Sequence, residues 1–197
     1  RFGFVAPMFL NTGLITFIHK ACVMKLFSFL LLGIGISLHI NGQQKTAQEK
    51  LGYSKETKLL IIHGDDVGLS HSQNSATFKA IQTGSVNSGS IMVPCPWFSE
   101  VAAYVKENPK VDLGLHLTLT SEWKNYKWGP VTASTIVPGL VNRNGFLYSS
   151  VDSVVMFAKP TEVEEEMRSQ VKRSLQMGID PTHLDAHMGG AFSTPAF

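Results

Sequence analysis

The sequence is poor in cysteine and in clustered positive charge. Cys22 and Cys95 are the two cysteines among 197 residues, too few for the disulfide framework of a small secreted domain. Lysines and arginines are scattered and are not interleaved with aromatic residues, so no groove for nucleic acid is predicted. We therefore expect no nucleic-acid partner, and we expect Cys95 to be a lone, buried thiol.

Acidic residues are missing from residues 1–43, and this absence explains the formal net charge of +2. The rest of the chain contains 14 basic and 15 acidic residues and is nearly neutral. Within the basic segment, Met24-Lys25 precedes the apolar run 26–38, which is too brief to span a bilayer comfortably. This pattern is typical of a secretory signal peptide that starts at Met24 and is cleaved near Gly42.

A signal peptide predicts a secreted or periplasmic protein with no stable membrane association after cleavage. Residues 1–23 would then be upstream sequence, although Phe2–Ile18 is apolar enough that a membrane hairpin is the alternative. Residues 44–57 are polar without apolar periodicity, which favours a flexible lead-in. We expect residues 58–197 to be the amino-terminal part of a domain truncated at its carboxyl end, because no closing element follows Met188–Gly190.

Apolar periodicity after residue 58 predicts alternating strands and helices. The aliphatic run Leu59–Ile62 is typical of a strand buried on both faces of a parallel sheet. The pattern continues with a helix capped by Ser70 or Ser72 and ending near Thr83, a strand over Ser88–Pro94, a helix over 98–108 and a strand over Val111–Thr120. This order predicts parallel βαβ units with right-handed crossovers, and hence an α/β fold.

A weakly periodic segment, 123–160, follows the third predicted strand. Its prolines and its Asn144-Gly145 turn signal predict a long loop over one end of the sheet, where loops tend to bind substrate. Thr161 with Glu164 predicts the capping box of a helix that Gly178 closes. Its inner stripe is expected to be Val163, Met167, Val171 and Leu175, and its acidic residues 162–166 are interpreted as a solvated face favoured by the helix dipole.

Two adjacent carboxylates, Asp65 and Asp66, follow the aliphatic run and lie between Gly64 and Gly68. Adjacent acids repel each other, and a bound cation or proton relieves that repulsion. The pair is therefore a candidate for one divalent-metal ligand beside one general base. Asp and Gly also commonly form the turn after a strand, so this stretch alone leaves an ordinary turn open.

Histidines occupy the polar faces of two later predicted strands. In 113–120 the leucines take one face while Gly114, His116 and two threonines take the other, and a period of two brings His183, Asp185 and His187 together. Taken alone, His116 is more typical of a hydrogen-bonded core histidine than of a metal ligand. Because the clusters follow successive strands, their side chains can converge, and one Asp oxygen with two His nitrogens is a common open set for a divalent ion. Ser-His-Asp catalysis is less favoured, since no Gly-x-Ser-x-Gly elbow occurs.

Three segments resemble the amino-terminal motifs of the YdjC-like carbohydrate deacetylases, the family that includes chitooligosaccharide deacetylase and the hopanoid-biosynthesis deacetylase. The segments are Ile62-His63-Gly64-Asp65-Asp66-Val67-Gly68, Gly114-Leu115-His116-Leu117 and Thr182-His183-Leu184-Asp185-Ala186-His187. The resemblance implies a (β/α) barrel of the polysaccharide-deacetylase type, incomplete in this chain. It also implies removal of acetyl groups from N-acetylated amino sugars or oligosaccharides with a divalent metal, Mg²⁺ or Zn²⁺. By the same resemblance Asp66, His116 and His187 are the metal ligands, and Asp65 is the catalytic base.

The motifs depart from the family pattern at two places. The first often opens with Asn-Ala or Asn-Ser where this chain has His63-Gly64, and the third often continues into further histidines where it has Met188–Gly190. His183 and Asp185 are expected either to orient His187 or Asp65 or to make ordinary strand-end hydrogen bonds. The general acid is expected in the part of the barrel that the chain lacks.

Two functions other than deacetylation stay open from the sequence. One is a non-catalytic carbohydrate-binding protein that keeps the metal set for structure. The other is a phosphoacceptor module that uses the acidic pair with magnesium, against which export and the additional histidines count.

Overall fold

The computed structural model describes residues 44–197, and its two compact units, one ending at Leu59 and one from Leu60 to Phe197, are treated separately. The signal peptide, the membrane-hairpin alternative and Cys22 all fall within 1–43, outside the described residues. In the first unit, helix α2 (Ala47–Lys50) is capped reciprocally, because Thr46 Oγ1 accepts from Glu49 N while Glu49 Oε2 accepts from Thr46 N. The lead-in expected at 44–57 therefore contains one helical turn.

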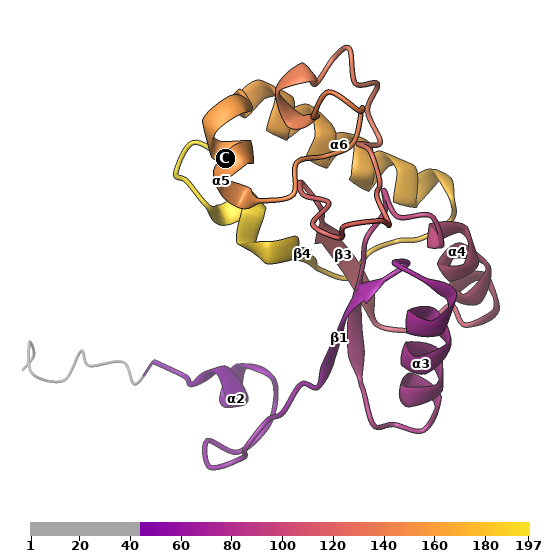
Figure 1. Cartoon of the computed structure of the whole chain (residues 1–197). Coiled ribbons are helices and arrows are strands. Elements are labelled where there is room, and N and C mark those ends of the chain that lie inside the picture. Colours follow the sequence, from indigo (N-terminus) through magenta and orange to yellow (C-terminus); the bar gives the residue numbers. More distant parts are fainter. Residues whose placement is uncertain (1–43) are drawn as a thin grey trace, which may run out of the picture. The chain divides into compact units, whose positions relative to one another are not determined.

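The second unit is built around a parallel sheet of four strands that pair in chain order (Figure 1). The strands are β1 (His63–Val67), β2 (Ser88–Ile91), β3 (Leu113–Leu117) and β4 (Leu184–Ala186). Helices α3 (His71–Gln82) and α4 (Phe98–Glu107) connect the first three strands, and α6 (Pro160–Gln176) precedes the fourth. This confirms the predicted α/β fold with helical crossovers. The sheet is open within the described residues, and its closure into a barrel stays a prediction.

The first strand begins four residues later than the sequence predicts. The aliphatic run was expected to be buried, but the side chains of Leu60 and Ile61 are 74% and 73% exposed. Residue-to-residue pairing with β2 starts where His63 faces Ser88, although Ile62 O already accepts from Asn87 N and Ser88 N. Leu60 and Ile61 therefore precede the strand, and the strand itself contains both acids of the motif.

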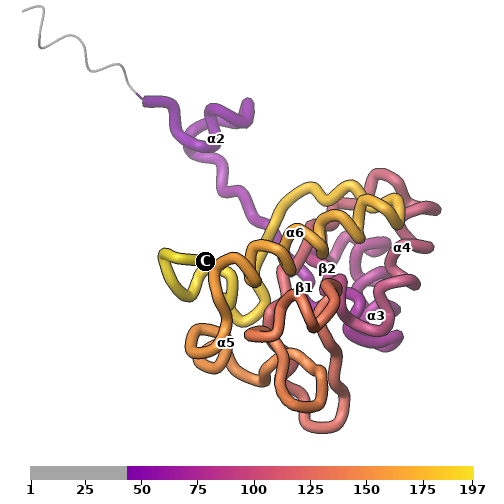
Figure 2. Tube along the Cα trace, turned by 90° about the horizontal axis from the view of Figure 1, so that it is seen from above, coloured from indigo at the N-terminus to yellow at the C-terminus, as the bar shows by residue number. Residues whose placement is uncertain are grey.

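The sheet has one apolar face and one polar face. Leu113 and Leu115 of β3 join Ile91 of β2 in the core that α3 and α4 cover. The two helices lie side by side in both views (Figures 1 and 2), with Phe78 stacked on Tyr104 at 3.8 Å between ring centroids. His116 directly follows Leu115 in the sequence and points to the opposite face, which confirms the alternation predicted for this strand.

The segment between β3 and α6 forms a second core, as well as the predicted long loop. It contains the short 3₁₀ helix η1 (Pro138–Leu140) and helix α5 (Val151–Phe157), of which the sequence predicted neither. Trp128 and Leu147 are buried there among apolar residues of the strand ends. The predicted Asn-Gly turn is confirmed, since Gly145 has φ +80° between two segments that form an antiparallel bridge.

Helix α6 begins one residue before the predicted Thr161 cap. Pro160 takes the first helical position, where its missing N–H costs nothing. Glu162 then does the capping assigned to Glu164, because its Oε2 accepts from Lys159 N at 3.2 Å and from Gly139 N at 3.1 Å. The helix end is as predicted, with Gly178 at φ +80° just beyond it.

The acidic run of α6 is only partly solvated, which corrects the sequence interpretation. Glu166 is fully buried and accepts hydrogen bonds from the backbone N–H groups of Val131 and Thr132 at 2.9 Å each. Gln170 Nε2 donates to the same carboxylate at 2.8 Å and also bonds the backbone of Thr118. Burial raises the pKa of Glu166, although these hydrogen bonds act to lower it. The sequence did not indicate this burial because the backbone N–H groups that Glu166 binds belong to a segment distant in the sequence.

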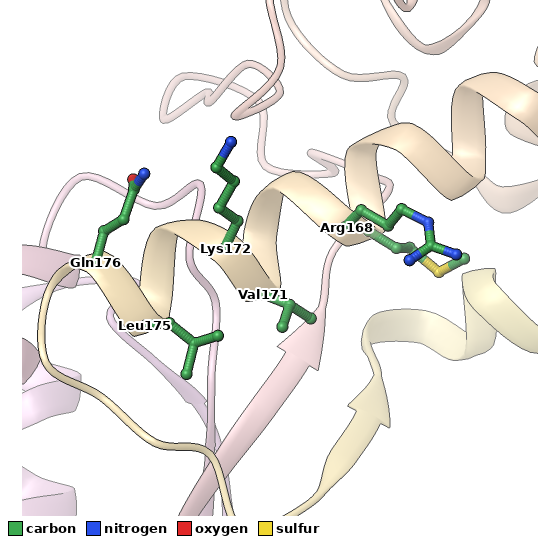
Figure 3. A pocket seen from close by; sticks show the side chains of 6 residues that line it. Arg168, Val171, Lys172, Leu175 and Gln176 are labelled. Atoms are coloured by element: carbon green, nitrogen blue, oxygen red, sulfur yellow. The ribbon is translucent and has the colours of Figure 1, made fainter.

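An apolar hollow lies along one side of α6 (Figure 3). Its lining is Met167, Arg168, Val171, Lys172, Leu175 and Gln176. Leu175 is 52% exposed, so the predicted inner stripe ends before it. The lining contains neither carboxylate nor imidazole, and the hollow is therefore no candidate for the chemistry that the motifs predict.

Cys95 is buried and free, as predicted, and burial raises the pKa of its thiol well above the usual range. None of the helices within residues 44–197 combines the length and the apolar character that a membrane crossing requires.

Removing the Glu166 carboxylate should destabilise the fold. In Glu166→Ala the N–H groups of Val131 and Thr132 lose their acceptor and Gln170 loses one of its two, so we expect the free energy of unfolding to fall by about 3 kcal/mol. Urea denaturation followed by circular dichroism measures this change. The exposed neighbour Glu165→Ala is the matched control and should stay within about 0.5 kcal/mol of the wild type. Equal losses in the two variants would contradict a structural role for Glu166.

Candidate metal centre

The two adjacent acids lie in a β-bulge at the carboxyl end of β1. Gly64 pairs with Gly89 and Val67 pairs with Ile91, so β1 takes one more residue than β2 over the same distance. Asp66 has φ 59°, a left-handed conformation that is uncommon outside glycine and that costs free energy. Neighbours in a regular strand point to opposite faces, but here both acids contact residues of the polar face.

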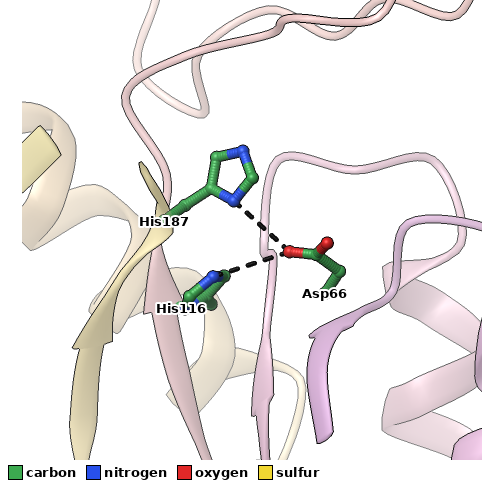
Figure 4. Close-up of side chains that lie close together, drawn as sticks. All are labelled: Asp66, His116 and His187. Carbon is green, nitrogen blue, oxygen red and sulfur yellow. Dashed lines mark ion pairs between the residues drawn. The ribbon is translucent and has the colours of Figure 1, made fainter. Parts of the chain in front are cut away.

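Asp66, His116 and His187 converge at the carboxyl ends of β1, β3 and β4 (Figure 4). Asp66 Oδ1 lies 3.5 Å from His116 Nε2 and 3.3 Å from His187 Nδ1. The histidine side chains are only 7% and 6% exposed, and one potential ligand atom from each of the three residues lies within 4.8 Å of the others. The structure thus brings together the three residues that the sequence singled out as ligands.

Each of these histidines has a carboxylate at its other ring nitrogen. Asp185 Oδ2 is 2.9 Å from His116 Nδ1, although the angle falls short of a hydrogen bond, and Glu122 Oε2 is hydrogen-bonded to His187 Nε2 at 3.0 Å. Such partners fix the orientation and tautomer of a ligating histidine. Asp185 was expected either to orient His187 or Asp65 or to make strand-end hydrogen bonds. It contacts His116, and its Oδ1 accepts from Ala186 N at the strand end.

Glu122 is the residue that sequence reasoning missed. It lies five residues beyond β3, at the start of a segment without periodicity. Its only signal in the sequence is that it directly follows the polar strand end Thr120-Ser121.

The electrostatics of the three residues suit a cation. The hydrogen bond from His187 lowers the pKa of Asp66 and outweighs burial, with the charges of both histidines adding to it. Burial lowers the pKa of His116. Burial acts in the same direction on His187, but its hydrogen bonds to Asp66 and Glu122 outweigh that effect and raise its pKa.

Metal ligation requires an anionic carboxylate and neutral imidazoles, so the pKa shifts of Asp66 and His116 favour the ligating state, whereas the raised pKa of His187 opposes it. One oxygen and two nitrogen donors of this kind fit a divalent ion.

A second group lies next to the first on the polar face and consists of His63, Asp65 and Asp185. His63 Nε2 is 3.4 Å from Asp65 Oδ1, and its Nδ1 is 3.0 Å from Ser88 Oγ. Ser90 Oγ lies 3.5 Å from a carboxylate oxygen of each acid. The predicted base, Asp65, is therefore close to the metal centre and turned away from its histidines.

His183 was expected either to orient His187 or Asp65 or to make strand-end hydrogen bonds, and its contacts are of the second kind. Its ring packs edge-on against His63, with 5.2 Å between centroids, and its Nδ1 is 2.9 Å from Thr182 Oγ1. The ring occupies the space in front of Gly114, where a Cβ atom would come within 2.5 Å of it. The glycine of the second motif is thus explained by His183 of the third motif.

Comparisons with known proteins agree with the motifs. Residues 59–196 match the family model of the YdjC-like proteins. The chain is similar to a carbohydrate deacetylase of Thermus thermophilus, with 37% identity over 72% of this chain and 47% of that protein. It is also similar to a chitooligosaccharide deacetylase of Serratia marcescens, with 33% identity over 66% of this chain and 49% of that protein.

A solved structure is similar as well. The crystal structure described as that of a cellobiose-phosphate cleavage protein from Enterococcus faecalis V583 matches with a TM-score of 0.62 and 25% identity, over 69% of this chain and 51% of that one. The chain therefore spans about half the length of the curated relatives it matches.

Loss of the Glu122 carboxylate should weaken metal binding without touching a ligand. In Glu122→Ala the His187 ring loses the partner on Nε2, and we expect divalent-metal affinity to fall about 10–100-fold. Glu122→Gln should lose less, because its amide oxygen still accepts from Nε2. Calorimetric titration of the metal-free protein measures the affinities, with the exposed neighbour Lys124→Ala as control. Wild-type affinity in Glu122→Ala would show that Glu122 does not support the site.

Proposed function

Because this chain belongs to the YdjC-like protein family, we propose that it provides the metal centre of a hydrolase that removes acetyl groups from N-acetylated amino sugars or oligosaccharides. The names of its relatives, carbohydrate deacetylase and chitooligosaccharide deacetylase, support the reaction and the substrate class. The observation that carries the proposal is the convergence of Asp66, His116 and His187 beside a further carboxylate, Asp65.

The ligand set fits Mg²⁺ or Zn²⁺, and such an ion supplies Lewis acidity, which activates water and polarises the acetyl oxygen. Asp66, His116 and His187 would hold it, while Asp185 and Glu122 keep the two rings in place. The bulge aims the two adjacent acids at different partners, so Asp65 is not drawn into the cluster of Asp66.

Asp65 is the general base in this proposal. Its side chain is 58% exposed, which leaves the carboxylate accessible to water, and His63 and Ser90 limit its orientation. A carboxylate placed in this way can take the proton of the attacking water. The deacetylase and the non-catalytic carbohydrate-binding protein differ at this step, because a binding protein does not need Asp65.

Asp65→Asn separates metal binding from chemistry. The substitution keeps the shape of the side chain and removes its basic lone pair, so we expect metal content to be retained while turnover falls about 10²–10⁴-fold. Acetate release from N-acetylglucosamine oligomers and metal content are measured together on the full-length protein. Asp66→Ala is the comparison variant and should lose the metal as well as the activity.

Other outcomes decide against parts of the proposal. Unchanged turnover in Asp65→Asn would exclude Asp65 as the base, and loss of metal in that variant would make both carboxylates ligands. A wild-type protein that binds metal and oligosaccharide but releases no acetate would be a carbohydrate-binding protein.

We also propose that the protein is exported, on the strength of the basic and apolar run that starts at Met24. Amino-terminal sequencing of material from the medium or periplasm should then give a mature chain that begins near Gln43. A mature chain that keeps Phe2–Ile18 in the membrane would contradict export.

A further inference from the structure

We propose that His63, Asp65 and Asp185 form a second divalent-cation site, which fills at higher metal concentration than the Asp66 centre. Because Asp65 is the base of the proposed function, occupation of this site should inhibit deacetylation. The inhibition rests on that function, whereas the second site does not.

The geometry of His63 resembles that of a ligating histidine. Its Nδ1 is held at 3.0 Å by Ser88 Oγ, which leaves Nε2 facing Asp65 Oδ1 at 3.4 Å. This Nε2 atom is buried and makes no hydrogen bond. A histidine fixed on one nitrogen, with the other free and aimed at carboxylates, is the usual arrangement around a metal.

The two carboxylates of the group share one weak donor, although Asp185 Oδ1 also accepts from Ala186 N at 2.7 Å. Ser90 Oγ lies 3.5 Å from each of them but has one proton, so it can serve only one acid at a time. On the far side of Asp185, His116 Nδ1 is buried and makes no hydrogen bond of good angle. Two neighbouring anions that share one weak donor repel each other, and a cation between them removes that repulsion.

The donor set is that of a metal site. One nitrogen of His63 and one oxygen from each acid lie within 4.8 Å of one another. An imidazole and two carboxylates bind Zn²⁺ and similar divalent ions.

The second site should bind more weakly than the first. The side chains of His63, Asp65 and Asp185 are 25%, 58% and 40% exposed, against 7% and 6% for the histidines of the Asp66 centre. Water competes more strongly at exposed ligands, and two nearby cations repel each other. A cation in this site lowers the basicity of the Asp65 carboxylate, which then accepts a proton from water less readily.

Zinc titration of the full-length, metal-free protein tests the second site. Calorimetry and metal analysis after equilibrium dialysis should give two ions for the wild type, one tight and one weak. His63→Ala and Asp65→Asn should each lose the weak ion and keep the tight one, whereas Asp66→Asn should lose the tight ion. His71→Ala is the control and should keep both, because His71 is exposed on α3 and bonds Glu100.

Acetate release provides a second measurement. Its ratio at two equivalents of zinc to that at one equivalent should fall below one in the wild type and should not fall in His63→Ala. An unchanged ratio in the wild type would overturn the inhibitory role.

The second site is overturned by a wild type that binds a single ion at saturation. It is equally overturned by His63→Ala or Asp65→Asn keeping both ions or losing both, since losing both would make the two groups one site. Failure of the proposed function looks different, because absence of acetate release leaves the zinc stoichiometry as it is.

Discussion

The polar face of the sheet depends on one carboxylate, Asp66, held between two buried imidazoles. Burying the two imidazole rings and the Asp66 carboxylate costs free energy when these groups have no partners. The contacts of Asp66 Oδ1 with His187 Nδ1 at 3.3 Å and with His116 Nε2 at 3.5 Å offset that cost. The position of the acid costs about 1–3 kcal/mol of backbone strain, the usual range for a non-glycine residue in the left-handed region. Strain of that size persists only where the surroundings hold the backbone firmly.

Two helices hold the bulge from the side opposite the histidines. Asn74 of α3 is fully buried, and its Oδ1 accepts from Gly68 N at 2.6 Å. Its Nδ2 donates to Trp97 O and to the carboxylate of Glu100 on α4. The exit of β1 is thereby tied to both helices of the apolar layer, so the strained turn at Asp66 is part of the packed fold.

The long segment after β3 secures the other side of the centre. Trp128 Nε1 donates to Thr120 O at 2.9 Å, and Ser121 N donates to Tyr148 O at 2.7 Å, directly before Glu122. Gln170 bonds the N–H and the C=O of Thr118, so α6 fixes the same strand end. The segment predicted as a loop near the substrate thus also positions the carboxylate that orients His187. It does this through a core of its own.

The sequence was sufficient to predict the position of those residues that follow from the alternation of faces along a strand. His116 and Asp185 lie on the polar face because alternate residues of a strand share a face, and parallel strands end at the same edge. It was insufficient wherever a distant segment decided the outcome. The exposure of Leu60 and Ile61 depends on where β2 begins, and the burial of Glu166 depends on two backbone N–H groups more than thirty residues away. The bulge could not be predicted either, since no sequence pattern indicates that Asp66 adopts φ 59°.

Asp185 makes the two clusters of the polar face interdependent. Its Oδ2 is 2.9 Å from His116 Nδ1 and 3.5 Å from Ser90 Oγ, while its Oδ1 accepts from Ala186 N at 2.7 Å. A cation bound to the Asp185 carboxylate would compete with His116 Nδ1 for that carboxylate. It would thereby affect the Asp66 centre, of which His116 is a member. Groups that share a partner are not additive. Asp185 is therefore the side chain through which a cation at the proposed second site would be coupled to the Asp66 centre.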